Sequence, residues 1–189
     1  MREYSCLPRQ CLGSSKYQIT AIQDKYIELI RVWRNAQMDV LRQPSPIDPG
    51  QQQEYYARHI WPTLTQAQPA NILMGLLFEG QFIGYGGLVH IGWEHARAEV
   101  SFLISPDRVK DVDLYAQDFS AFLGLIQQLA FADLKLHRLY TETYDIRPHH
   151  IAVLEANGFV REGVLRDHIR IDRRSVNSIF HGLLDSYGK

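Results

Sequence analysis

The sequence predicts a mixed α/β fold with one central, mostly antiparallel sheet of about seven strands, flanked by about four helices. Two kinds of run alternate along the chain. Short apolar or alternating runs bounded by turn residues indicate strands, and longer runs with apolar residues three or four positions apart indicate helices. A length of 189 residues gives room for one well-buried core and little for a second. We therefore expect a single domain.

The strands are predicted from short runs that end at turn residues. Residues 1–16 precede the predicted domain, which spans residues 17–189, and we expect them to form a poorly ordered arm or an addition at the sheet edge. The run NILMGLLF, a turn at Glu79-Gly80-Gln81 and a second apolar run indicate a hairpin. The predicted strands are residues 17–22, 71–78, 82–91, 98–104, 137–144, 159–171 and 176–184.

The helices are predicted from apolar periodicity and from residues that start and stop helices. Three prolines between residues 44 and 49 exclude a continuous helix through that loop. Proline begins the last helix and Gly158 ends it. A strand at 98–104, a long helix and a strand at 137–144 form a right-handed βαβ unit. The predicted helices are residues 26–38, 51–64, 114–132 and 148–157.

Composition and charge exclude several classes of function. The formal net charge is -1, so no positive field draws the protein to nucleic acid or to an anionic membrane. The N-terminal run MREYSCLPRQCLGSS lacks the apolar core of a signal peptide. No run approaches the ~20 apolar residues that span a bilayer. We expect a cytoplasmic protein with no nucleic-acid or membrane partner.

The cysteines and histidines do not predict a metal site. Cys6 and Cys11 have no second cysteine pair and no histidines at metal-ligand spacing, and a cytoplasmic thiol is usually reduced. His149 and His150 are adjacent on a predicted helix, where neighbouring side chains point about 100° apart. No carboxylate–histidine spacing completes a site with them or with His137. We expect free thiols and no bound metal.

Several short motifs stand at spacings typical of one known family. The first helical run holds Trp33-Arg34-Asn35. Further motifs in the C-terminal part are Leu154-Glu155, Gly158-Phe159, Glu162-Gly163, Leu165-Arg166 and Gly182-Leu183-Leu184. Together with the order of elements, they resemble the GNAT N-acetyltransferase superfamily, in the branch of ribosomal-protein N-terminal and amino-sugar N-acetyltransferases. The resemblance covers residues 17–184 and implies a GNAT fold.

The resemblance implies an enzyme that moves an acetyl group from acetyl-CoA to a primary amine by direct attack on the thioester. In the family, the cofactor arm pairs with a strand that parts from its neighbour and leaves backbone groups unpaired. Here that strand is residues 98–104, and Phe102, Leu103 and Ile104 would bind acetyl-CoA. A backbone N–H of this stretch, which we assign to Leu103, would stabilise the charge that develops on the thioester oxygen.

The expected pyrophosphate loop departs from the family's pattern, which has glycines there. The loop SPDRVKDVDLYAQ contains none. Arg108 and Lys110 could supply charge in place of close backbone contacts, and Arg147 could reach a phosphate or lie in solvent at the start of the last helix. If the loop does not hold acetyl-CoA, the alternative is a non-catalytic GNAT-fold module that binds a partner.

Glu99 is the first candidate for a general base, because it lies on the cofactor strand near the expected approach of the amine. Alternatively, it pairs with Arg97 or another arginine. The acceptor would be a small-molecule amine, such as a nucleotide-linked amino sugar or a polyamine-like metabolite, or a peptide N-terminus. The sequence leaves the oligomeric state open, a homodimer included. Residues expected at the acceptor are Trp33, Arg34, Asn35, Met38 and Trp93.

Overall fold

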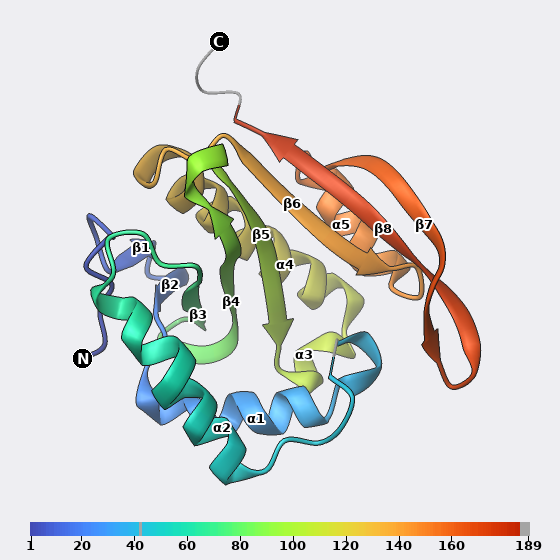
Figure 1. Ribbon diagram of the computed structural model, residues 1–189, viewed down its shortest axis with the longest axis horizontal. Helices are drawn as coiled ribbons and strands as arrows, with labels where there is room; N and C mark the ends of the chain where they lie inside the picture. The colour runs from blue at the N-terminus through green and yellow to red at the C-terminus, as the bar shows by residue number, and fades with distance from the viewer. Residues whose placement is uncertain (42, 186–189) are drawn as a thin grey trace.

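One mixed sheet dominates the fold, with eight strands in the order β1-β2-β3-β4-β5-β6-β8-β7 (Figure 1). The computed structural model describes residues 1–41 and 43–185. Neighbouring strands are antiparallel except β5 and β6, which are parallel. The predicted fold class is confirmed. The strands are β1 (Cys11–Gly13), β2 (Tyr17–Ala21), β3 (Ile72–Phe78), β4 (Gln81–Gly92), β5 (Arg97–Ile104), β6 (Arg138–Tyr144), β7 (Val160–Ile171) and β8 (Arg174–Leu184).

Helices cover both faces of the sheet. On one face, Ile30 and Trp33 of the first helix pack against Tyr85 of β4, and on the other, Phe119 and Phe122 belong to a larger core. None of the helices described in the structure is long and apolar enough to cross a membrane. The helices are α1 (Ile27–Asn35), α2 (Pro49–Tyr55), α3 (Pro106–Val109), α4 (Val112–Gln127) and α5 (Pro148–Ala156).

The N-terminal segment is part of the sheet and of the core. β1 pairs antiparallel with β2, which adds a strand to those predicted. Tyr4, Leu7 and Leu12 are buried in the larger core, and the Tyr4 hydroxyl accepts a hydrogen bond from the Leu73 N–H at 2.8 Å. Of the two expectations for residues 1–16, the structure has the addition to the sheet edge.

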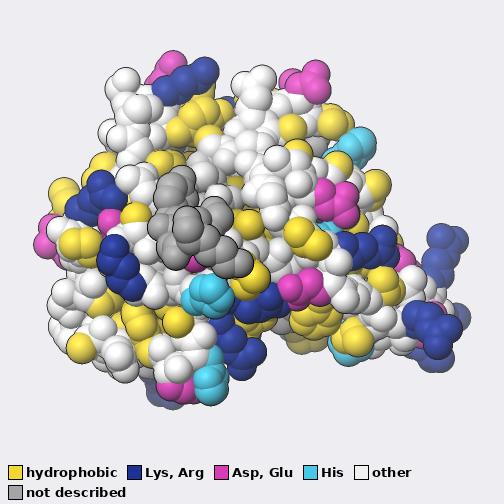
Figure 2. All heavy atoms as spheres, turned by 90° about the horizontal axis from the view of Figure 1, so that it is seen from above, with side chains coloured by type: hydrophobic (Ala, Val, Ile, Leu, Met, Phe, Trp, Pro, Cys, Tyr) yellow, Lys and Arg dark blue, Asp and Glu magenta, His cyan; other side chains and the backbone are white. Residues whose placement is uncertain are grey.

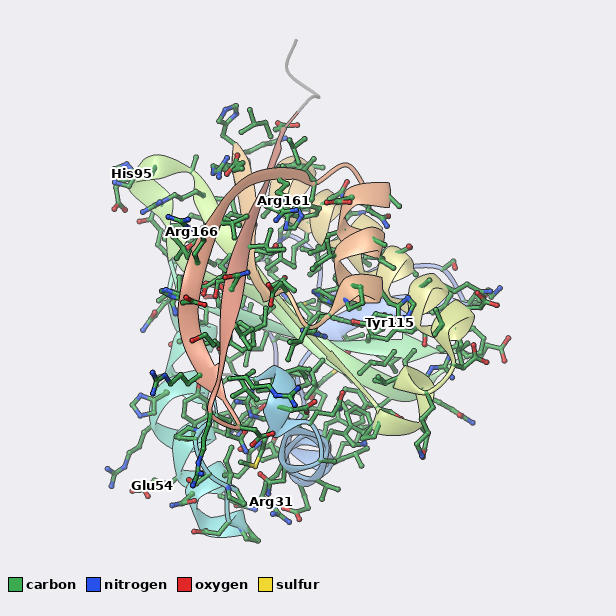
Figure 3. All side chains as sticks on the ribbon, turned by 90° about the vertical axis from the view of Figure 1, so that its right-hand side faces the viewer. Arg31, Glu54, His95, Tyr115, Arg161 and Arg166 are labelled. Atoms are coloured by element: carbon green, nitrogen blue, oxygen red, sulfur yellow. The ribbon has the colours of Figure 1, made fainter. Side chains whose placement is uncertain are left out.

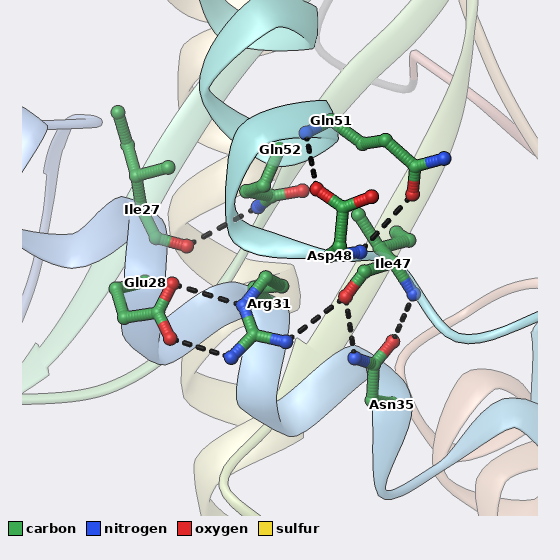
Figure 4. Close-up of polar contacts among 8 residues, drawn as sticks. All are labelled: Ile27, Glu28, Arg31, Asn35, Ile47, Asp48, Gln51 and Gln52. Carbon is green, nitrogen blue, oxygen red and sulfur yellow. Dashed lines mark hydrogen bonds and ion pairs between the residues drawn. The ribbon is translucent and has the colours of Figure 1, made fainter.

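The second helix begins earlier and ends sooner than predicted. Pro49 occupies its first turn, and Asp48 and Gln51 form a capping box in which each side chain accepts from the other's backbone N–H (Figure 4). Such a box satisfies N–H groups that have no partner within the helix. After α2 the chain continues as a π turn, Tyr56–Ile60, and a 3₁₀ turn, Trp61–Thr65.

The parallel strands β5 and β6 stay paired for only three residues each, ending at Glu99 and Tyr140. Beyond that point β5 continues to Ile104 paired with β4, and β6 continues to Tyr144 paired with β8. A V-shaped gap between the two strands is visible in Figure 1. The inner edge of β5 is therefore open from Glu99 onward, within the described part of the sheet.

Candidate active site

The open edge of β5 defines the candidate active site. The Ser105 N–H donates to the Ile83 carbonyl on β4 at 2.9 Å. Backbone groups of successive strand residues face opposite edges, so those of Leu103 also face β4, while those of Phe102 and Ile104 face the opening. The Leu103 N–H, predicted to stabilise the thioester oxygen, is thus turned into the sheet. The Phe102 N–H is the one that faces the opening.

Gln37 closes one end of this open edge. It follows α1 and is buried, and its side-chain amide donates to the carbonyl of Ile104 at 2.9 Å and to that of Trp33 at 3.3 Å. The Ile104 carbonyl therefore already accepts a hydrogen bond from Gln37. Phe102 is left as the main backbone contact for a ligand in the opening.

A cavity of about 370 Å³ lies between the end of α1 and the starts of α3 and α5; we call it the α5 cavity. Arg147 lines it and donates from Nη2 to the Tyr115 hydroxyl at 3.3 Å. That hydroxyl lies 2.6 Å from Nδ1 of His150, and Tyr115 points toward the start of α5 (Figure 3). Burial, together with the positive charge of Arg147, holds the pKa of His150 well below its ordinary value, so its ring is neutral.

Arg108 and Lys110, predicted to bind pyrophosphate, are engaged elsewhere. Arg108 forms a two-pronged ion pair with the fully buried Asp118 of α4, at 2.5 and 2.8 Å. The Tyr17 hydroxyl donates to the same carboxylate at 2.6 Å. Lys110 is exposed and pairs with Asp107 at 2.7 Å. Neither cation lines the α5 cavity.

The helices α3, α4 and α5 begin near the opening, and α3 is a single turn of four residues. At α4, the Asp111 side chain accepts hydrogen bonds from two backbone N–H groups of the first turn, so a carboxylate already satisfies them. α5 begins at Pro148 directly after Arg147 and has no side-chain cap. A helix N-terminus beside a guanidinium favours an anion, and Asp39 is the one carboxylate among the described residues that line this cavity.

A second cavity, of about 590 Å³, lies on the other face, between α1, α2 and β5; we call it the α1–α2 cavity. Its walls include Tyr55, Tyr56 and Tyr85, and Arg34 is the charged side chain among its described lining residues. Arg34 donates from Nε to Gln43 at 3.0 Å and from Nη1 to the Tyr85 hydroxyl at 2.9 Å. Burial works to lower the pKa of Arg34, but Tyr85 and the other tyrosines raise it on balance. The guanidinium is therefore charged.

Of the residues predicted at the acceptor, Arg34 is the one that lines the α1–α2 cavity. Trp33 is buried and stacks on an aromatic ring of β4 with centroids 5.2 Å apart. Trp93 donates its indole N–H to the Pro69 carbonyl at 2.9 Å. Met38 lies in the 3₁₀ turn after α1. None of these three residues is among the described lining residues of the cavity.

Asn35 acts on the cavity through the loop between α1 and α2 (Figure 4). Its Oδ1 accepts from the Ile47 N–H at 2.9 Å and from the Gln43 amide at 2.8 Å, and its Nδ2 donates to the Ile47 carbonyl at 2.8 Å. Gln52 ties α2 to α1, because its amide donates to the Ile27 carbonyl at 3.2 Å. These bonds fix the wall that Ile47 contributes to the cavity.

Glu99 lies where β5 and β6 part. Side chains alternate along a strand, so Glu99 is on the same face as Ser101 and Leu103, which line the α1–α2 cavity. Its Oε2 is 2.8 Å from Nδ1 of His90. The Glu99 side chain is 14% exposed and that of His90 is 65% exposed. A mostly buried carboxylate is thus linked to solvent through a histidine.

Sequence reasoning missed Tyr85, Tyr115 and Gln37. Tyr85 could have been predicted from the register between β4 and β5, because it pairs with Leu103 on the cofactor strand. Tyr115 meets His150 from a helix 35 residues away in the chain, and no local pattern indicates such a contact. Gln37 could not be found either, because its role depends on where α1 ends against β5.

Comparison with known proteins identifies the family. A model of the acetyltransferase (GNAT) domain matches residues 19–180. The chain belongs to the GNAT acetyltransferase family. It is an acetyl-CoA-dependent N-acetyltransferase, as the resemblance predicted, whereas the branch within the superfamily stays a prediction. No curated protein matches the sequence.

Solved structures with this GNAT fold include spermidine N-acetyltransferases from Vibrio cholerae. One, in complex with CoA and spermine, has 21% identity and a TM-score of 0.77, covering 92% of this chain and 98% of that chain. A dodecameric structure of that enzyme in an intermediate state has 21% identity and a TM-score of 0.73, covering 92% and 96%. A chimera with hSSAT has 20% identity and a TM-score of 0.74, covering 89% and 95%. At these identities the likeness shows the fold.

The residues around the opening fit acetyl-CoA, the cofactor of GNAT acetyltransferases. The pantetheine arm is extended and carries amides, and the outward backbone groups of Phe102 can pair with them as a strand edge does. Arg147, beside the uncapped start of α5, fits a phosphate. A positive charge and an uncapped helix N-terminus are both present at the start of α5, so a phosphate contact there does not require a glycine loop.

Proposed function

We propose that the protein acetylates a primary amine held in the α1–α2 cavity, with acetyl-CoA in the opening between β5 and β6. The observation that carries this proposal is the parting of the two strands at Glu99. It places a carboxylate, the outward N–H of Phe102 and the cavity wall along one stretch of β5. The acceptors that we propose are amino sugars, including nucleotide-linked ones, and peptide N-termini.

Acetyl-CoA supplies the acetyl group as a thioester. An uncharged amine would attack its carbonyl carbon, so that the C–N bond forms, the C–S bond breaks and CoA leaves as a thiol with a second proton from the nitrogen. An amine arrives mainly as an ammonium ion and must lose a proton first. The Glu99 carboxylate is placed to accept it, and His90, on Oε2 of Glu99, offers a route to solvent. The Phe102 N–H is placed to donate to the oxygen on which negative charge develops. Arg147 holds the phosphate end of the cofactor.

The alternative of a non-catalytic binding module rested on the glycine-free loop, and the match of the acetyltransferase domain over residues 19–180 stands against it. In this loop, where the family has glycines, the Asp111 side chain accepts hydrogen bonds from the first backbone N–H groups of α4. Arg147 and the start of α5 offer a replacement beside the opening, and they support a cofactor site without that loop.

The test is calorimetric titration of acetyl-CoA, followed by measurement of thiol release with a panel of amines. We expect binding in the micromolar range and about tenfold weaker binding for Arg147→Gln, because a charge-assisted phosphate contact is lost. Arg58→Gln is the matched control, since Arg58 is exposed on the π turn and pairs with Glu54 at 2.7 Å. No binding at millimolar acetyl-CoA, or no thiol release with any amine, would refute the proposal.

A further inference from the structure

We infer that the acceptor carries an anionic group, a carboxylate or a phosphate, several bonds away from its amine, and that Arg34 binds this anion in the α1–α2 cavity. The inference rests on the proposed function, because it names the acceptor class of the same cavity. Arg34 lines the cavity and, among the described residues, bonds to the uncharged side chains of Gln43 and Tyr85. An arginine has five N–H donors, and these two bonds leave three of them for a ligand.

Arg34 differs in its partners from several other partly buried arginines of the chain. A partly buried charge is costly unless it is paired. Three of these arginines pair with a carboxylate of the protein, whereas Arg34 and Arg147, which both line cavities, bond to uncharged groups. The pairs are Arg31 with Glu28, Arg108 with Asp118 and Arg138 with Glu162. No described carboxylate pairs with Arg34, and its charge is directed at a cavity. An anionic ligand group supplies the missing partner.

The cavity lining disfavours a purely cationic acceptor. No aspartate or glutamate is among its described lining residues, and Arg34 is its charged group. The similar structures described above are those of spermidine N-acetyltransferases, and a polyamine would place ammonium groups beside this guanidinium. Like charges repel most strongly where water is scarce. The acceptor of this chain therefore differs in charge from spermidine.

The positions of Glu99 and Arg34 set a minimum length for the acceptor. Arg34 is bonded to Tyr85, which pairs with Leu103 in the sheet, whereas Glu99 pairs with Val89 at the other end of the cavity wall. Leu103 is four residues beyond Glu99, which is about 14 Å along an extended strand. An acceptor whose amine and anion are several bonds apart matches this spacing along the strand better than an α-amino acid, in which the two groups are adjacent. An amino sugar phosphate or a short peptide with a free C-terminus has its amine and anion well separated.

Matched acceptor pairs that differ only in the anion test the inference. Triglycine is compared with its C-terminal amide, glucosamine 6-phosphate with glucosamine, and spermidine serves as the cationic acceptor. The wild type should show about 10- to 100-fold higher kcat/KM for the anionic member of one pair. Arg34→Gln should abolish that preference by lowering kcat/KM for the anionic member more than for the uncharged member, and Arg58→Gln should keep the preference.

The pair that shows the preference identifies the anion as carboxylate or phosphate. Equal use of charged and uncharged members, a preference for spermidine, or an equal loss for both members in Arg34→Gln would overturn the inference and leave the proposed function standing. If none of the amines tested causes the wild type to release thiol, the proposed function fails. The inference is then decided by calorimetry of the same acceptor pairs, which measures whether the anionic member binds more tightly than the uncharged one. Should Arg34→Gln not fold, Arg34→Lys keeps the charge and should reduce the preference without abolishing it.

Discussion

At the scale of single residues, the Glu99 carboxylate is the group placed to accept the proton of the amine. Glu99→Gln keeps the size and removes the basicity, so we expect kcat to fall about 10²- to 10⁴-fold with the affinity for acetyl-CoA unchanged. The acidic limb of the pH profile of kcat/KM should disappear. Glu94→Gln, exposed in the turn before β5, is the control. An unchanged pH profile would remove Glu99 as the base.

Arg108 has a structural role, although its place in the loop suggested a phosphate contact. Removing it leaves the buried Asp118 carboxylate without its cation. We expect Arg108→Ala to lower the free energy of unfolding by about 3–5 kcal/mol and to leave the dissociation constant of acetyl-CoA unchanged. Lys110→Ala, which removes an exposed ion pair, should change neither. Weaker cofactor binding with unchanged stability would restore the sequence-based assignment of Arg108.

His150 makes the stability of the protein depend on pH. Burial, with Arg147 and His181 nearby, lowers its pKa well below 6.5 in the folded state, so between the two pKa values the unfolded chain binds more protons. The contribution of the neutral ring is therefore present above pH 6.5 and lost as the pH falls below it, by up to about 1.4 kcal/mol per pH unit. Urea unfolding between pH 7.5 and 5.5 should show this slope in the wild type and in His149→Gln. His150→Gln should flatten it, and equal slopes in all three proteins would contradict the assignment.

At the scale of elements, strong apolar runs were predictable and contacts between elements were not. The hairpin of β3 and β4 follows from two apolar runs and a turn, and its strands are where the sequence placed them. β1, Cys11–Gly13, is too short to show a period. The parting of β5 from β6 at Glu99 is a relation between two strands distant in the sequence, which no local pattern indicates. The site was therefore predictable as a stretch of β5. Which residue of that stretch turns its backbone N–H toward the gap between β5 and β6 follows only from the pairing of β5 with β4.

The loop between α1 and α2 is the element whose position controls the α1–α2 cavity. Asn35 holds it by three hydrogen bonds to Ile47 and Gln43. We expect Asn35→Ala to raise the KM of the acceptor about tenfold, because the wall at Ile47 loses its support, and to leave acetyl-CoA binding unchanged. Steady-state kinetics and calorimetry measure the two effects. Gln53→Ala, exposed on α2, should change neither, and an unchanged KM in Asn35→Ala would show that the loop holds without Asn35.

At the scale of the whole molecule, net charge conceals an uneven distribution. The formal charge is -1, yet arginine side chains gather on the projecting β7–β8 hairpin (Figure 2). The arginines of this hairpin are Arg161, Arg166, Arg170, Arg173 and Arg174. Composition alone predicted no positive field, because it averages this hairpin with the acidic remainder of the chain. The net charge summed over the sequence limits the kinds of partner that the whole protein attracts, but it does not describe the charge of one of its surfaces.

The N-terminal segment ties the outer edge of the sheet to the larger core, so the fold needs residues that the sequence placed outside its domain. Removing residues 1–16 uncovers the edge of β2 and takes Tyr4, Leu7 and Leu12 from the core. Each buried apolar side chain contributes about 1.5–3 kcal/mol, and a domain has only about 5–15 kcal/mol to lose. We expect the truncated chain to lose cooperative thermal unfolding. Tyr4→Phe, which removes only the hydroxyl bonded to Leu73, should stay folded with a lower Tm. A truncated chain that unfolds cooperatively near the wild-type Tm would show that the segment is an arm after all.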